Sequence, residues 1–138
     1  MPVEIEFAAQ RDMAYLVRND THISPDLLRE KVARSEVIVV RVAGQTVGWL
    51  RFGYLWDFVP VMNMLAVEEE ERRKGYGTGM IQFWEQEMRR RGYKLVLTST
   101  QADEQAQHLY RRLGYVDCGA MLFPGQVPLE VFLIKSLD

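Results

Sequence analysis

The 138-residue sequence contains few of the residues that build disulfide frameworks or metal sites. It has one cysteine, Cys118, and two histidines, His22 and His108. One cysteine cannot form an intramolecular disulfide, and these three residues do not follow the short spacings of a structural zinc site. The sequence therefore predicts neither an internal disulfide nor a bound metal.

Long apolar runs and an excess of one charge are also missing. No segment reaches the roughly 18 to 20 apolar residues of a membrane-spanning helix, and residues 1–6 lack the basic and then apolar pattern of a secretory signal. The formal net charge is −2 and the pI about 5.7, whereas nucleic-acid-binding domains are typically basic. These absences predict a cytoplasmic protein that binds neither membranes nor nucleic acid.

The composition and length are those of one folded domain. Hydrophobic residues make up 48% of the sequence and charged residues 26%, which is typical of a soluble globular chain. Because Pro60 cannot donate a hydrogen bond to a strand ladder, the strand near it is expected to start at residue 61. Apolar periodicity predicts strands at 3–7, 37–42, 46–54, 61–67, 94–99, 115–121 and 129–137, and helices at 9–18, 25–35, 78–91 and 104–113.

The most informative stretch is rich in glycine and basic residues, between an apolar run and a periodic helical segment. Glycines permit positive φ angles and close approach of a ligand, and the first N–H groups of a helix have no intrahelical acceptor. A phosphate there would also meet the positive end of the helix dipole. The sequence thus predicts an anion site formed by Arg72, Arg73, Lys74, Gly75, Tyr76, Gly77, Thr78 and Gly79.

Two common phosphate-binding motifs do not fit this stretch. The Walker motif needs four residues between its first glycine and a Gly-Lys-Ser/Thr run, which the sequence lacks. The dinucleotide fingerprint needs G-x-G-x-x-G and an acid about twenty residues on, but the glycines here run G-x-G-x-G and residue 95 is leucine. What remains is R-x-x-G-x-G directly after a strand, formed by Arg72, Gly75 and Gly77.

This hexapeptide resembles the acyl-CoA pyrophosphate loop of the GCN5-related N-acetyltransferase (GNAT) family. A second segment, 103–115, is similar to another family signature, Asn-x-x-Ala-x-x-Leu/Phe-Tyr-x-x-x-Gly-Phe/Tyr. Ala106 and Tyr110 match it, and Asp103 replaces the asparagine. The resemblance implies an α/β fold with the order β-α-α-β-β-β-α-β-α-β-β. Its central sheet would be mixed but mostly antiparallel, with six to seven strands and about four flanking helices, splayed between strands 61–67 and 94–99.

The resemblance also implies a reaction and a set of site residues. The protein would use acetyl-CoA as a co-substrate and acetylate a primary amine of an unidentified small molecule or peptide by direct attack in a ternary complex. Tyr110 would be the general acid for the departing thiolate, although a tyrosine on such a helix face is also a common core residue. Besides the glycine stretch, the implied contacts of acetyl-CoA are the main chain of Leu65, Ala66 and Val67, together with Asp103, Ala106 and Tyr110.

The group that removes the amine proton is not evident from the sequence. An alkyl amine with a pKa near 10.4 is only about one part in a thousand neutral at pH 7.4. Family members often carry a glutamate within the strand at 61–67, but here the polar residue is Asn63. Glu68 belongs to a charge run that is typical of a solvated turn. Asp57, between two aromatic residues, could act as a base if buried, or could bind a cationic acceptor.

We therefore hypothesise that Asp57 and Asn63 face the acceptor and that a water chain removes its proton. Asp103 would be unfavourable beside a pyrophosphate unless it turns away as a helix cap.

Two alternatives follow: an acyl-CoA-binding module with little or no catalysis, and an interaction protein whose glycine stretch is only a turn. Cys118 is expected to be buried in a strand. The apolar segment 129–137 suggests that a second subunit covers its outer face or edge, as in a homodimer.

Overall fold

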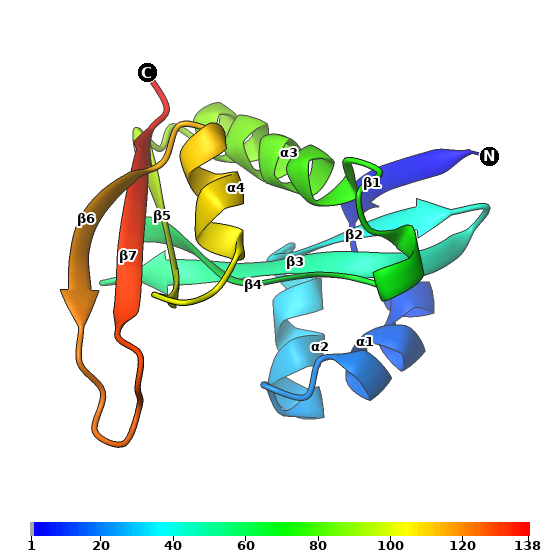
Figure 1. The fold of residues 1–138 in the computed structure, drawn as a ribbon. Helices are drawn as coiled ribbons and strands as arrows, with labels where there is room; N and C mark the ends of the chain where they lie inside the picture. The colour runs from blue at the N-terminus through cyan, green and yellow to red at the C-terminus, as the bar shows by residue number, and fades with distance from the viewer. Residues whose placement is uncertain (1) are drawn as a thin grey trace. The chain divides into compact units, whose positions relative to one another are not determined.

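The computed structural model describes residues 2–138 (Figure 1). The strands and helices follow the predicted order, and two single-turn 3-10 helices are added. Within residues 2–138, no helix has the length and apolar character needed to cross a membrane. The elements are β1 (Val3–Phe7), η1 (Gln10–Asp12), α1 (Met13–Asn19), α2 (Pro25–Ala33), β2 (Val37–Val42), β3 (Gln45–Leu55), β4 (Val59–Val67), η2 (Glu69–Glu71), α3 (Tyr76–Arg90), β5 (Leu95–Gln101), α4 (Ala106–Arg112), β6 (Val116–Met121) and β7 (Glu130–Ser136).

The seven strands form one hydrogen-bonded sheet in the order β1-β2-β3-β4-β5-β7-β6. The pairs β1/β2, β2/β3, β5/β7 and β6/β7 are antiparallel. The pair β4/β5 is parallel, and its register covers only Val61 opposite Leu97 and Met62 opposite Thr98. The mixed, mostly antiparallel sheet predicted from the sequence is confirmed.

The tertiary contacts group the chain into two compact units. The first unit extends to Phe52 and resumes over Met64–Trp84, and the second consists of Gly53–Asn63 and Glu85–Asp138. In the first unit all six residues of β2 are buried. Ser24 caps α2 by accepting a hydrogen bond from the Leu27 N–H at 3.3 Å, as its place before a proline predicts. The core cluster of this unit contains Ala8, Met13, Leu16, Leu28, Val37, Val39 and Trp49.

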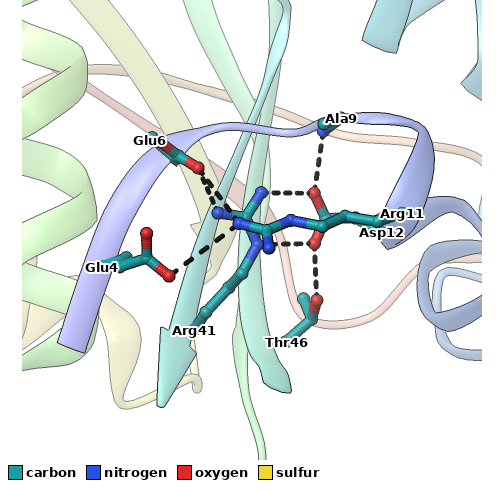
Figure 2. Close-up of polar contacts among 7 residues, drawn as sticks. All are labelled: Glu4, Glu6, Ala9, Arg11, Asp12, Arg41 and Thr46. Atoms are coloured by element: carbon teal, nitrogen blue, oxygen red, sulfur yellow. Dashed lines mark hydrogen bonds and ion pairs between the residues drawn. The ribbon is translucent and has the colours of Figure 1, made fainter. Parts of the chain in front are cut away.

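A buried ion pair joins the first three strands of the chain (Figure 2). Arg41 on β2 donates from Nε and Nη2 to the two carboxylate oxygens of Asp12, at 2.9 and 2.7 Å. Asp12 also accepts from Thr46 Oγ1 on β3 at 2.6 Å and from the Ala9 N–H at 2.8 Å. Arg41 Nη1 pairs with Glu6 on β1. Because the hydrogen bonds are nearly complete, the cost of burying these charges is offset.

A second buried carboxylate stabilises the second unit. Glu85, near the end of α3, accepts hydrogen bonds from Tyr115 Oη and Lys135 Nζ, both at 2.8 Å. Lys135 lies on β7, and its Nζ is 5.7 Å from the centre of the Tyr115 ring. This group therefore links α3 to Tyr115 and to β7.

Several expectations about the strands are wrong. Pro60 lies inside β4, which starts at Val59, because a missing N–H donor is tolerated near the end of a strand. Of the two alternatives for the segment 129–137, the sheet edge is wrong, since β6 lies outside β7, whereas the outer face stays a prediction. Cys118 is exposed rather than buried, because β6 is the edge strand and all six of its residues are exposed.

We expect Asp12→Ala to lower the free energy of unfolding by about 3 to 5 kcal/mol, because it leaves the buried Arg41 guanidinium without its main partner. Urea denaturation at pH 7 measures this. Burial raises the pKa of Asp12, but the hydrogen bonds from Arg41, the Ala9 N–H and Thr46 lower it more, so the net pKa is lowered. The stabilisation is thus complete above the unfolded pKa, about 3.9, and is lost as the pH falls through the folded pKa.

Arg11→Ala is the matched control. Arg11 is exposed and lies 3.9 Å from Glu4 and 3.5 Å from Glu6, so its loss should cost less than about 1 kcal/mol. An Asp12→Ala protein as stable as wild type at pH 7 would show that the buried pair does not stabilise the fold.

Candidate functional site

The glycine-rich stretch lies between η2 and the first turn of α3. Arg73 and Gly75 have φ angles of 65° and 84°, which turn the chain into the helix. The Gly79 N–H donates to the Gly75 carbonyl at 2.9 Å, so the helix starts at Tyr76, two residues earlier than predicted. Glycine is a poor helix former, which is why the sequence pattern placed the start at Thr78. The N–H groups of Tyr76, Gly77 and Thr78 have no intrahelical acceptor.

The three glycines of the loop differ in what surrounds them. A side chain at Gly75 would meet nothing within 4 Å, so its positive φ is its distinguishing feature. A Cβ at Gly77 would lie 3.8 Å from Leu65 Cδ2, an ordinary contact. A Cβ at Gly79 would lie only 2.7 Å from Ile5 Cδ1 on β1. Gly79 therefore permits close packing, whereas the missing side chain of Gly77 leaves the helix start open to a ligand.

The three basic residues of the loop are exposed but not equally available. Arg72 Nε donates to the Val67 carbonyl at 3.0 Å, and Lys74 pairs with Glu71 at 2.9 Å. Within residues 2–138, Arg73 makes no hydrogen bond or ion pair. The Arg73 guanidinium is therefore the cation of the loop with its donors unused.

Leu65, Ala66 and Val67 are half-buried at the end of β4. A Cβ at Gly48 on β3 would lie 2.7 Å from the Ala66 carbonyl oxygen, so this strand pair depends on a glycine at that position. The Val67 carbonyl is occupied by Arg72. A role of these three residues in binding a thioester carbonyl stays a prediction.

Glu68 does not belong to a solvated charge run. It is half-buried, and its carboxylate accepts a hydrogen bond from Tyr15 Oη on α1 at 2.9 Å. Burial and the Glu68 carboxylate together raise the pKa of Tyr15. Only the three glutamates of η2 form the expected polar turn. The long sequence separation between Tyr15 and Glu68 explains why the charge pattern did not reveal this pair.

Tyr110 lies in α4 within the second unit and is only 5% exposed. Burial raises its pKa, while a hydrogen bond with Thr98 opposes the shift. Thr98 in turn donates to the Met62 carbonyl at 3.4 Å, and the Tyr110 ring lies 5.9 Å from that of Tyr115. Tyr110 is thus a packed aromatic whose hydroxyl stays protonated at neutral pH.

Asp57 lies in the turn before β4 and Asn63 lies within β4, and both are exposed. Asp57 is not buried between Trp56 and Phe58, because it lies in the turn before the strand with a φ of 69°. The burial that would favour Asp57 as a base is therefore missing. Binding of a cation is the alternative that its position leaves open.

In the second family signature, segment 103–115, the start of α4 differs from the expectation. Asp103 is exposed and does not cap α4, because the helix starts at Ala106 with Gln105 in the cap position and no side-chain cap. Glu104 Oε1 instead accepts the Gln101 N–H at 3.0 Å. Gln107 Nε2 donates to the Ala102 and Glu104 carbonyls at 2.7 and 2.8 Å. These residues hold the turn, and the sequence pattern did not single them out.

The structure thus distributes the predicted site residues between the two units. The first contains Leu65 to Val67, Glu68 and the loop from Arg72 to Gly79, and the second contains Asp57, Asn63, Asp103, Ala106 and Tyr110. In the part of the chain that the structure describes, no three His, Cys, Asp or Glu residues are grouped to hold a metal ion.

The comparisons with known proteins agree with this fold. The sequence model of the Acetyltransferase (GNAT) family matches residues 5–115. No curated protein sequence matches. Solved structures with the same fold include an acetyltransferase of the GNAT family from Bacillus cereus (TM-score 0.83, 14% identity, 99% of this chain and 98% of that chain covered). A second is ribosomal-protein-alanine N-acetyltransferase from Brucella melitensis (TM-score 0.80, 19% identity, 96% of this chain and 99% of that chain covered). A third is yncA from Salmonella typhimurium with its cofactor acetyl-CoA (TM-score 0.80, 20% identity, 100% of this chain and 95% of that chain covered).

We expect Gly79→Ala to destabilise the protein by about 1 kcal/mol, because the new methyl group would overlap Ile5 Cδ1 and force it to move. Ile5→Val removes that atom, so the double variant should recover most of the loss relative to Ile5→Val alone. Gly77→Ala is the control, and it should be neutral or slightly stabilising because alanine favours the helix. Thermal unfolding followed by circular dichroism tests all four proteins, and equal effects of Gly77→Ala and Gly79→Ala would contradict the packing argument.

Proposed function

The chain belongs to the Acetyltransferase (GNAT) family, and on this basis we propose that it transfers the acetyl group of acetyl-CoA to a primary amine. The observation that carries the proposal is the start of α3. There the N–H groups of Tyr76, Gly77 and Thr78 lack intrahelical acceptors, and Gly77 has no side chain that would keep a ligand from the backbone. A pyrophosphate would accept from these donors and pair with the unused guanidinium of Arg73.

The proposed reaction is attack of a neutral amine on the thioester carbon. A bond forms between nitrogen and carbon, the carbon–sulfur bond breaks, the amine loses one proton and the thiolate gains one. We propose that main-chain groups of Leu65 to Val67 bind the carbonyl oxygen, as in the family resemblance. Removing the proton from an alkyl ammonium at pH 7.4 requires roughly 4 kcal/mol, so the site must present either a base or ordered water.

The group that we propose to stabilise the departing thiolate is Tyr110. A thiol has a pKa near 8.5 and a phenol one near 10, and burial raises the pKa of Tyr110 further. A complete transfer from Tyr110 to the thiolate is therefore unfavourable at equilibrium. Tyr110 would instead donate a hydrogen bond to the developing charge on sulfur, and water would finally protonate the thiolate.

For the acceptor side, we propose that Asn63 faces the amine. The side-chain amide of Asn63 cannot act as a base, so we propose that a water chain removes the proton of the amine. A catalytic Asp57 stays a prediction from the sequence. A peptide amine is the first acceptor class to test, because one of the similar structures is named as a ribosomal-protein-alanine N-acetyltransferase. The cytoplasmic location and the homodimer are retained as proposals from the sequence.

A second candidate is an acyl-CoA-binding module without turnover. Two observations favour it: Asn63 occupies the strand in which the family often has a glutamate, and the exposed Asp103 places a carboxylate where the family has an amide. Acetyl-CoA binding without thiol release on any amine would select this candidate.

Calorimetric titration with acetyl-CoA tests the phosphate site. We expect micromolar binding to the wild type and at least a tenfold loss for Gly77→Asp, which places a carboxylate against the phosphate at the open helix start. Gln82→Glu adds the same charge on the exposed face of α3 and should bind like the wild type. If the wild type does not bind at millimolar acetyl-CoA, both the transferase and the binding module are ruled out.

Tyr110→Phe tests the hydrogen bond from Tyr110 to the departing thiolate. With a peptide amine that supports thiol release, we expect kcat to fall by about 10² or more while the affinity for acetyl-CoA is unchanged. Tyr115→Phe is the contrasting variant: it removes the hydrogen bond to Glu85 and should lower stability but not kcat. Equal kcat values for Tyr110→Phe and the wild type would assign Tyr110 to the core alone.

A further inference from the structure

The turn between β3 and β4 has an unusual backbone for its sequence. Its two central residues, Trp56 and Asp57, have φ angles of 55° and 69°, and the Phe58 N–H donates to the Leu55 carbonyl at 3.1 Å. Two successive left-handed residues define a type I′ hairpin turn, which strongly favours Asn-Gly. A tryptophan and an aspartate therefore hold this backbone at an energetic cost, and such strain is concentrated at functional sites.

The same turn carries the two most exposed large aromatic side chains of its unit. Trp56 is 74% and Phe58 63% exposed, whereas Trp49 and Trp84 are 6% and 0% exposed. The Trp56 and Phe58 ring centres lie 6.4 Å apart with a tilt of 38°. These rings contribute little to the core, so their surface is available to a partner.

Asp57 indicates the chemistry of that partner. Its carboxylate makes no hydrogen bond or ion pair with any residue from 2 to 138. Arg91, which contacts the neighbouring Tyr54 hydroxyl at 3.3 Å, is already paired with Glu87. A neutral apolar partner would desolvate the carboxylate without compensation. A lysine or arginine side chain would pair with the carboxylate and rest on an aromatic face.

We propose that the turn Leu55–Phe58 is a docking point for a lysine or arginine side chain of a peptide or protein partner. The proposal goes beyond acetyl transfer and does not depend on it, because every test below is made without acetyl-CoA. Asp57 supplies the charge, and Trp56 and Phe58 supply the aromatic surface.

The probe is the blocked peptide Gly-Lys-Gly-Lys-Gly, and its control is the same peptide with both lysines acetylated. Trp56 is the exposed tryptophan, so acrylamide quenching of tryptophan fluorescence reports on it. We expect the lysine peptide to reduce the quenching constant at least twofold with a submillimolar Kd, and the acetylated peptide to have no effect. Asp57→Asn should weaken binding at least tenfold. Asp26→Asn, which removes an exposed carboxylate on α2, should not.

The double variant Trp56→Asn/Asp57→Gly separates binding from folding. It installs the residues that the backbone favours, so the Tm should rise by a few degrees while the peptide no longer binds. Anisotropy of a fluorescently labelled peptide measures binding here, because Trp56 is absent. Loss of binding in a more stable protein cannot result from unfolding.

Four results would overturn the proposal. They are no protection of Trp56 at millimolar lysine peptide, equal binding of the acetylated peptide, equal binding by Asp57→Asn, and protection of Trp56 by phosphatidylcholine vesicles instead of peptide. Self-association that light scattering detects in the wild type but not in the double variant would also overturn it, because a second copy of the chain would then cover the turn.

Discussion

The start of helix α3 depends on one close approach, between Gly79 and the side chain of Ile5. A residue larger than glycine fits there only if the Ile5 side chain moves. Ile5 is itself fixed by pairing with Val40 on β2, and the same two strands are joined by Arg41 and Glu6. The buried charge network around Asp12 therefore acts on more than local stability, because it fixes the strand against which the open helix end is packed.

The two units use buried carboxylates in different ways. Asp12 is held by the guanidinium of Arg41, the hydroxyl of Thr46 and the nearby N–H of Ala9, so it ties its 3-10 helix to β2 and β3. Glu85 receives a phenol and an ammonium from distant segments. The hydroxyls of Tyr110 and Tyr115 also differ in their partners. The Tyr110 hydroxyl is hydrogen-bonded with Thr98, whereas the Tyr115 hydroxyl donates to Glu85. Only the first could turn toward a substrate without breaking a buried charge pair.

The sequence predicted the elements better than it predicted the partners of individual side chains. The glycine spacing and the Ser24-Pro25 pair depend on local backbone geometry, so the loop and the start of α2 could be inferred. The pairing of Tyr15 with Glu68 and the lone carboxylate of Asp57 depend on residues that the fold brings together or keeps apart, and no local pattern encodes them. The burial of Cys118 was also predicted wrongly. Burial of a strand depends on its place in the sheet, and the composition of β6 does not reveal that it is the edge strand. The same reason explains why the edge position expected as one alternative for the segment 129–137 was wrong.

The exposed Cys118 on β6 has a practical consequence for any assay that follows thiols. It is the sole cysteine of the chain, and partial burial and the neighbouring Asp117 raise the pKa of its thiol. Its thiolate fraction is thus small at neutral pH, and it should react slowly with disulfide reagents. A reagent that counts free coenzyme A would also register this thiol, but at no more than one equivalent per chain. That slow, stoichiometric signal is an internal standard for protein concentration, and a signal above it measures turnover.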